Sequence, residues 1–205
     1  MNRAPGLLAI ALAATCANAG VSRAARLESS AALSRELSMG RSAQVTLHWT
    51  TSALPGMPPR TVTGTLTLEA PDRVRLDLAG TGERLVARDD GSEWLQPATR
   101  QLLRFGAQQG APALRWWRAL LGDTSQVTER PLAPRRFALV QRTRAGVADS
   151  ALVRLDGRGL PGELEIASGD GTLRYRLSGW RFARGRGPAY FRIVAPAGYE
   201  TVDVR

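Results

Sequence analysis

The alternation of apolar and polar residues at every second position constrains the fold of this chain more than any other feature. Residues 42–51 show it clearly, because Val45, Leu47 and Trp49 alternate with polar residues. Successive side chains of a β-strand point to opposite faces of a sheet, so this spacing predicts a strand with one apolar and one polar face. Strands of this kind are typical of antiparallel sheets that cover a core on one face and meet water on the other.

The same spacing recurs in short segments that Gly, Pro and Asp residues separate. Residues 60–69 and 73–79 each place apolar side chains on one face, among them Leu66, Leu68, Val74, Leu76 and Leu78. Further strands are predicted at residues 84–88, 92–96, 100–105, 136–142, 151–156, 163–167, 172–179 and 190–194. The proline-rich residues 54–60 interrupt the pattern and predict a loop. Short strands at regular intervals with turn signals between them predict an antiparallel sheet or barrel.

Residues 21–37 and 112–122 have helical rather than strand spacing of their apolar residues. The second segment begins with a proline and ends with a glycine, as helices often do. Its apolar arc is wider than the roughly 100° stripe of a surface helix, and it comprises Leu114, Trp117, Leu120 and Leu121, with Trp116 at its edge. We therefore predict that this helix lies on or over an apolar surface.

Residues 1–19 have the three parts of a cleavable signal peptide. Arg3 provides a positive charge, and residues 7–14 form an unbroken apolar run that is too short to cross a bilayer as a helix. Residues 17–19 (Ala-Asn-Ala) then match the small residues that signal peptidase recognises. We expect cleavage after this segment, which leaves residues 20–205 as one exported domain.

The only cysteine, Cys16, lies inside this segment and raises an alternative. A bacterial lipoprotein signal would use it for lipid attachment, with a bulky apolar residue three positions earlier and a small residue just before it. Ala13 and Thr15 fit neither requirement. We favour cleavage, which leaves the exported domain without a cysteine and therefore without disulfide or thiol chemistry.

The charged residues argue against a nucleic-acid-binding protein, although the formal net charge is +10 at pH 7. Every one of the 28 basic residues is an arginine, and these arginines are spread along the chain rather than gathered in one block. Export also separates the protein from nucleic acid. A solvated basic face is the favoured interpretation, and attraction to an anionic membrane surface, at about 1 kcal/mol per basic residue, is the alternative.

Motifs for catalysis or metal binding are missing from the sequence. It contains no G-x-S-x-G, no H-E-x-x-H and no lysine for a phosphate-binding loop. The only histidine, His48, lies in the middle of a predicted strand, where a structural role is favoured over metal binding. We expect a non-enzymatic protein without metal or cofactor. A catalytic triad that assembles in space around His48 is the alternative.

Several features follow one another in a distinctive order along the exported domain. They begin with an alternating strand, a turn at Pro71 and a second alternating strand, and continue with Leu85-Val86, Asp90-Gly91, Trp94, Pro97 and residues 100–102. The C-terminal part adds residues 190–198, Thr201, Asp203 and Arg205. This order resembles LolA, the periplasmic carrier of outer-membrane lipoproteins, and its relatives. The resemblance covers most of the exported domain.

The resemblance implies a mainly β fold, an incomplete antiparallel β-barrel that is concave and apolar inside and covered by short helices as a lid. It implies a periplasmic, monomeric carrier that accepts lipoprotein acyl chains from an inner-membrane transporter and passes them to an outer-membrane receptor. The cavity is expected to be lined by Val45, Leu47, Trp49, Leu66, Leu68, Val74, Leu76, Leu78 and Trp94. The expected lid residues are Leu114, Trp116, Trp117, Leu120 and Leu121.

Departures from the family pattern leave other functions open. The family typically carries an arginine just before the turn proline, and that arginine takes part in lid opening and cargo release; here the position is Ala70. The first alternative is therefore a relative that carries another amphiphile, such as a lipid-linked polyketide or glycolipid, beside a dedicated inner-membrane exporter. A sensor of mislocalised lipoproteins and an exported hydrolase are further alternatives. A plain packed core, without a ligand cavity, would produce the same alternation.

Overall fold

The computed structural model describes residues 27–51, 60–107, 112–122, 127–141, 149–168 and 171–204. The predicted signal peptide at residues 1–19, with Cys16, lies outside the described residues, as does nearly all of the proline-rich segment. None of the helices in the described part of the chain is long and apolar enough to cross a membrane.

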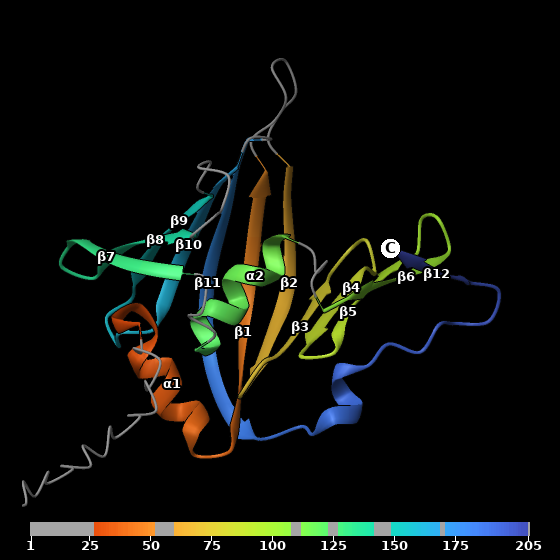
Figure 1. Cartoon of the computed structure of the whole chain (residues 1–205), viewed down its shortest axis with the longest axis horizontal. Coiled ribbons are helices and arrows are strands. Elements are labelled where there is room, and N and C mark those ends of the chain that lie inside the picture. Colours follow the sequence, from red (N-terminus) through yellow and green to blue (C-terminus); the bar gives the residue numbers. More distant parts are fainter. Residues whose placement is uncertain are drawn as a thin grey trace, which may run out of the picture.

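The described strands form one twelve-stranded sheet (Figure 1). Its order is β12-β6-β5-β4-β3-β2-β1-β11-β10-β9-β8-β7. The strands are β1 (Arg41–Thr51), β2 (Arg60–Glu69), β3 (Arg73–Leu78), β4 (Arg84–Arg88), β5 (Gly91–Gln96), β6 (Gln101–Gly106), β7 (Val127–Ala133), β8 (Arg136–Gln141), β9 (Ser150–Leu155), β10 (Pro161–Ser168), β11 (Gly171–Arg184) and β12 (Glu200–Val204).

Nearly all neighbouring strands pair antiparallel, as expected when short turns connect them. The strand pair β1 and β11 is different because it joins the two halves of the chain: Trp49 lies opposite Tyr175. The two outer strands, β7 and β12, do not pair with each other, so the sheet is open. The predicted fold class, an incomplete β-barrel with short helices, is confirmed. The β6–β12 pair is parallel, which departs from the purely antiparallel prediction.

Two α-helices lie on one face of this sheet, which we call the inner face. They are α1 (Ala31–Ser38), preceded by the 3-10 turn η1 (Glu28–Ser30), and α2 (Pro112–Leu121). Helix α1 contacts β1 and α2, and α2 contacts β3. Figure 1 shows α2 lying across the sheet in front of β1 and β2. The helix predicted from the terminal proline and glycine is therefore confirmed as α2, and the predicted helix at residues 21–37 is confirmed over its described C-terminal part.

The main core fills the space between the inner face and the helices. It is one continuous cluster of apolar side chains from most of the strands and from the inward sides of both helices, and Leu33, Leu47, Leu66, Trp117 and Leu164 are all fully buried in it. This cluster explains the alternation in the sequence, because each inward position on β1, β2 and β3 contributes to it.

The outer face is not simply exposed to water, which corrects the expectation of one solvated face. The C-terminal strap, which we define as residues 185–199, crosses the outer face of β2 to β6 before the chain joins the sheet as β12. Ile193 of the strap packs against Val86, Leu95 and Leu102 in a second, smaller cluster. This covering buries side chains on the polar side of the pattern, so Glu93 is only 8% exposed.

The prediction of a strand at residues 190–194 is wrong. The strap contains the 3-10 turn η2 (Pro188–Phe191), and residues 192–196 have no regular structure. Its backbone groups bond to side chains of the sheet instead of a neighbouring strand: Arg75 donates to the Tyr190 carbonyl at 2.7 Å and Ile193 N–H donates to Glu93 at 2.7 Å. The alternation arises because Phe191 and Ile193 face the sheet.

Candidate functional site

The predicted cavity residues come together on the inner face. The aliphatic ones on β1, β2 and β3 point the same way and are at most 5% exposed, namely Val45, Leu47, Leu66, Leu68, Val74, Leu76 and Leu78. Trp49 and Trp94 are half-buried and pack against the same cluster. The structure thus assembles a broad apolar floor from three adjacent strands. It is built from local alternation and from the register that places Leu66 opposite both Val45 and Leu76.

The predicted lid residues face this floor from α2. All of them are buried in the main core cluster: Leu114, Trp116, Trp117, Leu120 and Leu121. Trp116 and Trp117 are 2% and 0% exposed. Both indoles therefore lie against the floor in this state, with the arc of α2 fully covered. A helix with so wide an apolar arc stabilises the structure mainly through this contact.

Three aromatic rings mark the place where floor and lid meet. Trp49 on β1 stacks on Tyr175 of β11 with ring centroids 5.9 Å apart, and Trp117 of α2 meets the same Tyr175 ring edge-on at 5.3 Å. Stacked and edge-to-face pairs at such distances are favourable, at about 0.5–1.5 kcal/mol beyond the burial itself. We call Trp49, Tyr175 and Trp117 the aromatic cluster.

Polar groups in the aromatic cluster are poorly satisfied. The indole Nε1 atoms of Trp49 and Trp117 are buried and have no hydrogen-bond partner among the described residues. A buried donor left in this way costs about 1–3 kcal/mol. Burial also raises the pKa of the Tyr175 hydroxyl far above its ordinary value of 10.0, because the charged phenolate would be desolvated. The cluster thus carries no charge, and its aromatic rings bring two indole N–H donors into an otherwise apolar core.

Tyr175 is the residue of this site that the sequence analysis left out. It follows the alternation of the strand predicted at residues 172–179, so its inward direction could be predicted. Its contact with Trp49 could not, because the pairing of β1 with β11 joins segments far apart in the chain.

A hollow lies on the outer face of β1, β2 and β11, where the side chains differ in character from those of the floor. It has a volume of about 470 Å³ and is lined by His48, Thr50, Thr61, Arg174 and Arg176. Its arginines are paired with the carboxylates of β10, since Arg174 lies 2.9 Å from Glu165 and Arg176 lies 3.9 Å from Glu163. All of the lining side chains are therefore polar or charged, unlike those of the floor. Within the described residues, no group of three His, Cys, Asp or Glu side chains is arranged to hold a metal ion.

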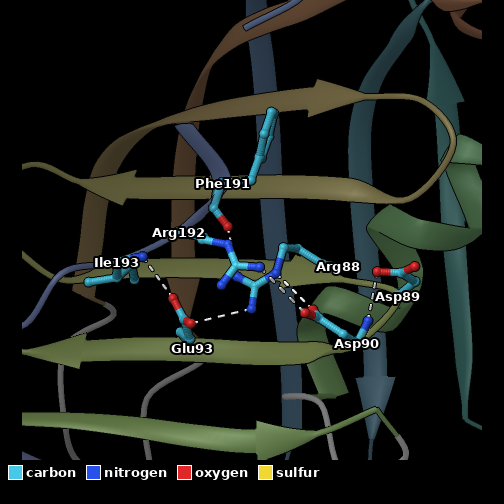
Figure 2. Close-up of polar contacts among 7 residues, drawn as sticks. All are labelled: Arg88, Asp89, Asp90, Glu93, Phe191, Arg192 and Ile193. Atoms are coloured by element: carbon cyan, nitrogen blue, oxygen red, sulfur yellow. Dashed lines mark hydrogen bonds and ion pairs between the residues drawn. The ribbon is translucent and has the colours of Figure 1, made fainter. Parts of the chain in front are cut away.

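Arg88 and Glu93 fasten the strap to the outer face (Figure 2). Arg88 donates to the Phe191 carbonyl at 2.8 Å and to Asp90 at 2.8 Å, and it lies 3.3 Å from Glu93. Burial lowers the pKa of Arg88, but the hydrogen bonds that Arg88 donates to the carboxylates of Asp90 and Glu93, together with their negative charges, outweigh this and raise the pKa above its ordinary value. Arg88 is therefore a fixed cation that holds both the strap and the β4–β5 turn, and it lies on the opposite side of the sheet from the floor.

Ala70, where the family pattern has an arginine, lies at the rim of the sheet beside the turn before β3. It borders a hollow of about 280 Å³ together with Leu37, Gly40, Arg41, Glu69, Arg184, Gly185 and Gly187. Arg41 in this hollow reaches α1, with its Nη1 2.7 Å from Glu36. An arginine from β1, rather than from position 70, thus links the sheet to a helix on the inner side.

No protein-family model matches the chain, and no curated protein matches its sequence. Similar solved structures include an uncharacterized conserved protein from Thermus thermophilus, at 13% identity, with 84% of this chain and 95% of that chain covered and a TM-score of 0.49. A LolA superfamily protein from Nitrosomonas europaea has 11% identity, coverage of 80% and 97%, and a TM-score of 0.41. The Mycobacterium tuberculosis lipoprotein LppX has 16% identity, with 72% of this chain and 90% of that chain covered and a TM-score of 0.32.

Proposed function

We propose that this protein is an exported, non-enzymatic carrier that shields the acyl chains of a lipoprotein, or of another acylated amphiphile, between α2 and the inner face of the sheet. The observation that carries the proposal is the contact between the floor and α2, which is made by apolar side chains on both sides. A single helix with such a contact can be displaced by a ligand that offers equivalent apolar surface.

The energy of acyl-chain burial is large enough for this exchange. Each methylene moved from water to an apolar surface contributes about 0.8 kcal/mol. The free energy of burying an acyl chain of ordinary lipid length is therefore comparable to that of the contact between one short amphipathic helix and the sheet. This mode of binding needs no sequence motif, in agreement with the absence of catalytic motifs from the sequence.

The proposed setting is the periplasm, with the signal peptide at residues 1–19 directing export. The partners are an inner-membrane transporter that loads the acyl chains and an outer-membrane receptor that accepts them. The protein acts as a monomer, without cofactor and without nucleic acid. The resemblance of the sequence to LolA supports this setting.

A relative that carries another amphiphile is the second candidate, and Ala70 favours it. The arginine that the family uses for lid opening and cargo release is replaced, while Arg41 contacts α1 from another position. Release of the cargo would then depend on a different contact and could deliver the cargo to a different receptor. Genes for a lipoprotein transporter or for a biosynthetic cluster beside this gene would separate the two candidates.

We expect the protein purified from the periplasm without detergent to carry an acylated ligand, or to take up a synthetic diacylated lipopeptide in a one-to-one complex. Native mass spectrometry measures both, and the same peptide without its acyl chains is the matched control. Protein that is consistently free of ligand and also fails to take up the lipopeptide, although folded, would refute the carrier function.

A further inference from the structure

Four of the five indole N–H groups of the protein fall into two kinds, those with an acceptor and those without one among the described residues. Trp94 donates to Glu83 at 3.1 Å and Trp180 donates to the Pro161 carbonyl at 2.8 Å. Trp49 and Trp117 have no acceptor in the described part of the chain, although both Nε1 atoms are buried. Buried indole donors usually find a partner, so a pair without one requires an explanation.

Both unsatisfied donors belong to the aromatic cluster. Trp49 comes from the floor and Trp117 from α2, and they contact the same Tyr175 ring, at 5.9 Å and 5.3 Å between centroids. The donors therefore lie where the floor and α2 meet. The other floor residues that we name are aliphatic: Val45, Leu47, Leu66, Leu68, Val74, Leu76 and Leu78.

We infer that the aromatic cluster selects ligands whose acyl chains are joined through a carbonyl group, as in esters and amides, with the indole N–H groups of Trp49 and Trp117 donating to the carbonyl oxygen. This inference rests on the proposed carrier function and adds the ligand's linkage chemistry to it. A carbonyl oxygen accepts a strong N–H hydrogen bond, whereas an alkyl ether oxygen between two methylenes accepts a weaker one. The burial of the aliphatic part is the same in both.

The test compares a diester phosphatidylglycerol with its diether analogue, which has the same headgroup and chains of the same length. Binding to the full exported domain is measured by competition against a fluorescent lipopeptide. We expect the wild-type protein to bind the diester about five- to tenfold more tightly, which corresponds to about 1 kcal/mol.

Substitutions that remove only the N–H group identify its source. Trp117→Phe and Trp49→Phe keep an aromatic ring but lose the N–H group, so in at least one of them the ratio of diester to diether affinity should fall to about twofold or less. Trp180→Phe is the matched control, because its N–H is already bonded to the Pro161 carbonyl and Trp180 is not among the floor or lid residues, and it should keep the wild-type preference. Melting temperatures confirm that each variant is folded.

The outcomes separate the inference from the carrier function. Equal affinity of the wild-type protein for the two lipids, or an undiminished preference in both Trp117→Phe and Trp49→Phe, would overturn the inference and leave the carrier function standing. Binding of the fluorescent lipopeptide but of neither lipid would overturn the inference alone. Failure of the folded wild-type protein to bind the fluorescent lipopeptide would overturn the carrier function and the inference with it.

Discussion

Replacing Trp117 by alanine should lower the free energy of unfolding by about 3–5 kcal/mol, the range for large aromatic side chains in a packed core. Trp117 is fully buried and contacts Tyr175, so the variant loses both the burial and a ring contact. Chemical denaturation of the ligand-free protein measures the change. A loss smaller than about 1 kcal/mol would contradict the packing of α2 on the floor.

The ligand gives this prediction its second part. If acyl chains occupy the space between α2 and the floor, they should fill the cavity that Trp117→Ala creates, as apolar molecules fill engineered cavities. A saturating diacylated lipopeptide should therefore stabilise Trp117→Ala more than it stabilises a control variant. Mass action stabilises every variant that binds, so the difference between variants is the informative quantity.

Trp180→Ala is the control. Trp180 is also buried, at 6% exposed, but it lies five residues further along β11 than Tyr175, which is roughly 16 Å at 3.3 Å per residue. It should lose comparable stability without the additional gain from the lipopeptide. Equal stabilisation of the two variants would contradict binding beneath α2.

Replacing Glu93 by alanine should lower the free energy of unfolding by about 3 kcal/mol, because it leaves buried partners behind. Its carboxylate accepts the Ile193 N–H at 2.7 Å and lies 3.3 Å from Arg88, and both side chains of this ion pair are at most 12% exposed (Figure 2). The amide of Ile193 should also lose its protection from hydrogen exchange, since the strap is held there through its backbone.

Asp90→Asn is the matched control for the strap. Asp90 bonds to the same Arg88 at 2.8 Å, but its side chain is 54% exposed, so the loss should stay below about 1 kcal/mol. Exchange of the Ile193 amide should not change in this variant. Equal losses in the two variants, or unchanged protection of Ile193 in Glu93→Ala, would contradict the role of Glu93 in fastening the strap.

The strands that sequence reasoning located are those whose alternation is local. For β1 to β5 the inward residues belong to one core and the turns carry Gly, Pro or Asp, so element and face follow from spacing alone. Helix α2 was predicted for a related reason, since its terminal proline and glycine fixed both ends.

The strands that were missed lack this signal. In β7 only Val127 is buried and Pro131 interrupts the strand, as suits an edge strand. In β12 no residue is fully buried, and its partner, β6, runs parallel and far away in the sequence. Alternation shows only which side chains are buried. A strand at residues 190–194 was therefore the wrong prediction, because the strap buries one face without belonging to the sheet.

The floor and lid residues could be predicted as a buried set, because burial follows from spacing. The aromatic cluster could not, since it depends on the β1–β11 pairing and on where α2 lies. Burial of Glu93 could not be predicted either. It needs the strap, whose position is decided by single side-chain hydrogen bonds rather than by a repeating pattern.

Photo-cross-linking tests the central proposal, acyl chains bound between α2 and the floor, most directly. A diacylated lipopeptide with a diazirine group in one acyl chain is bound, irradiated, and the adducts are mapped by tandem mass spectrometry. We expect adducts on inward residues of β1, β2 and β3 and on α2, including Trp117. Adducts confined to the outer face, such as the hollow around His48 and Arg176, or no adduct in folded protein, would contradict it.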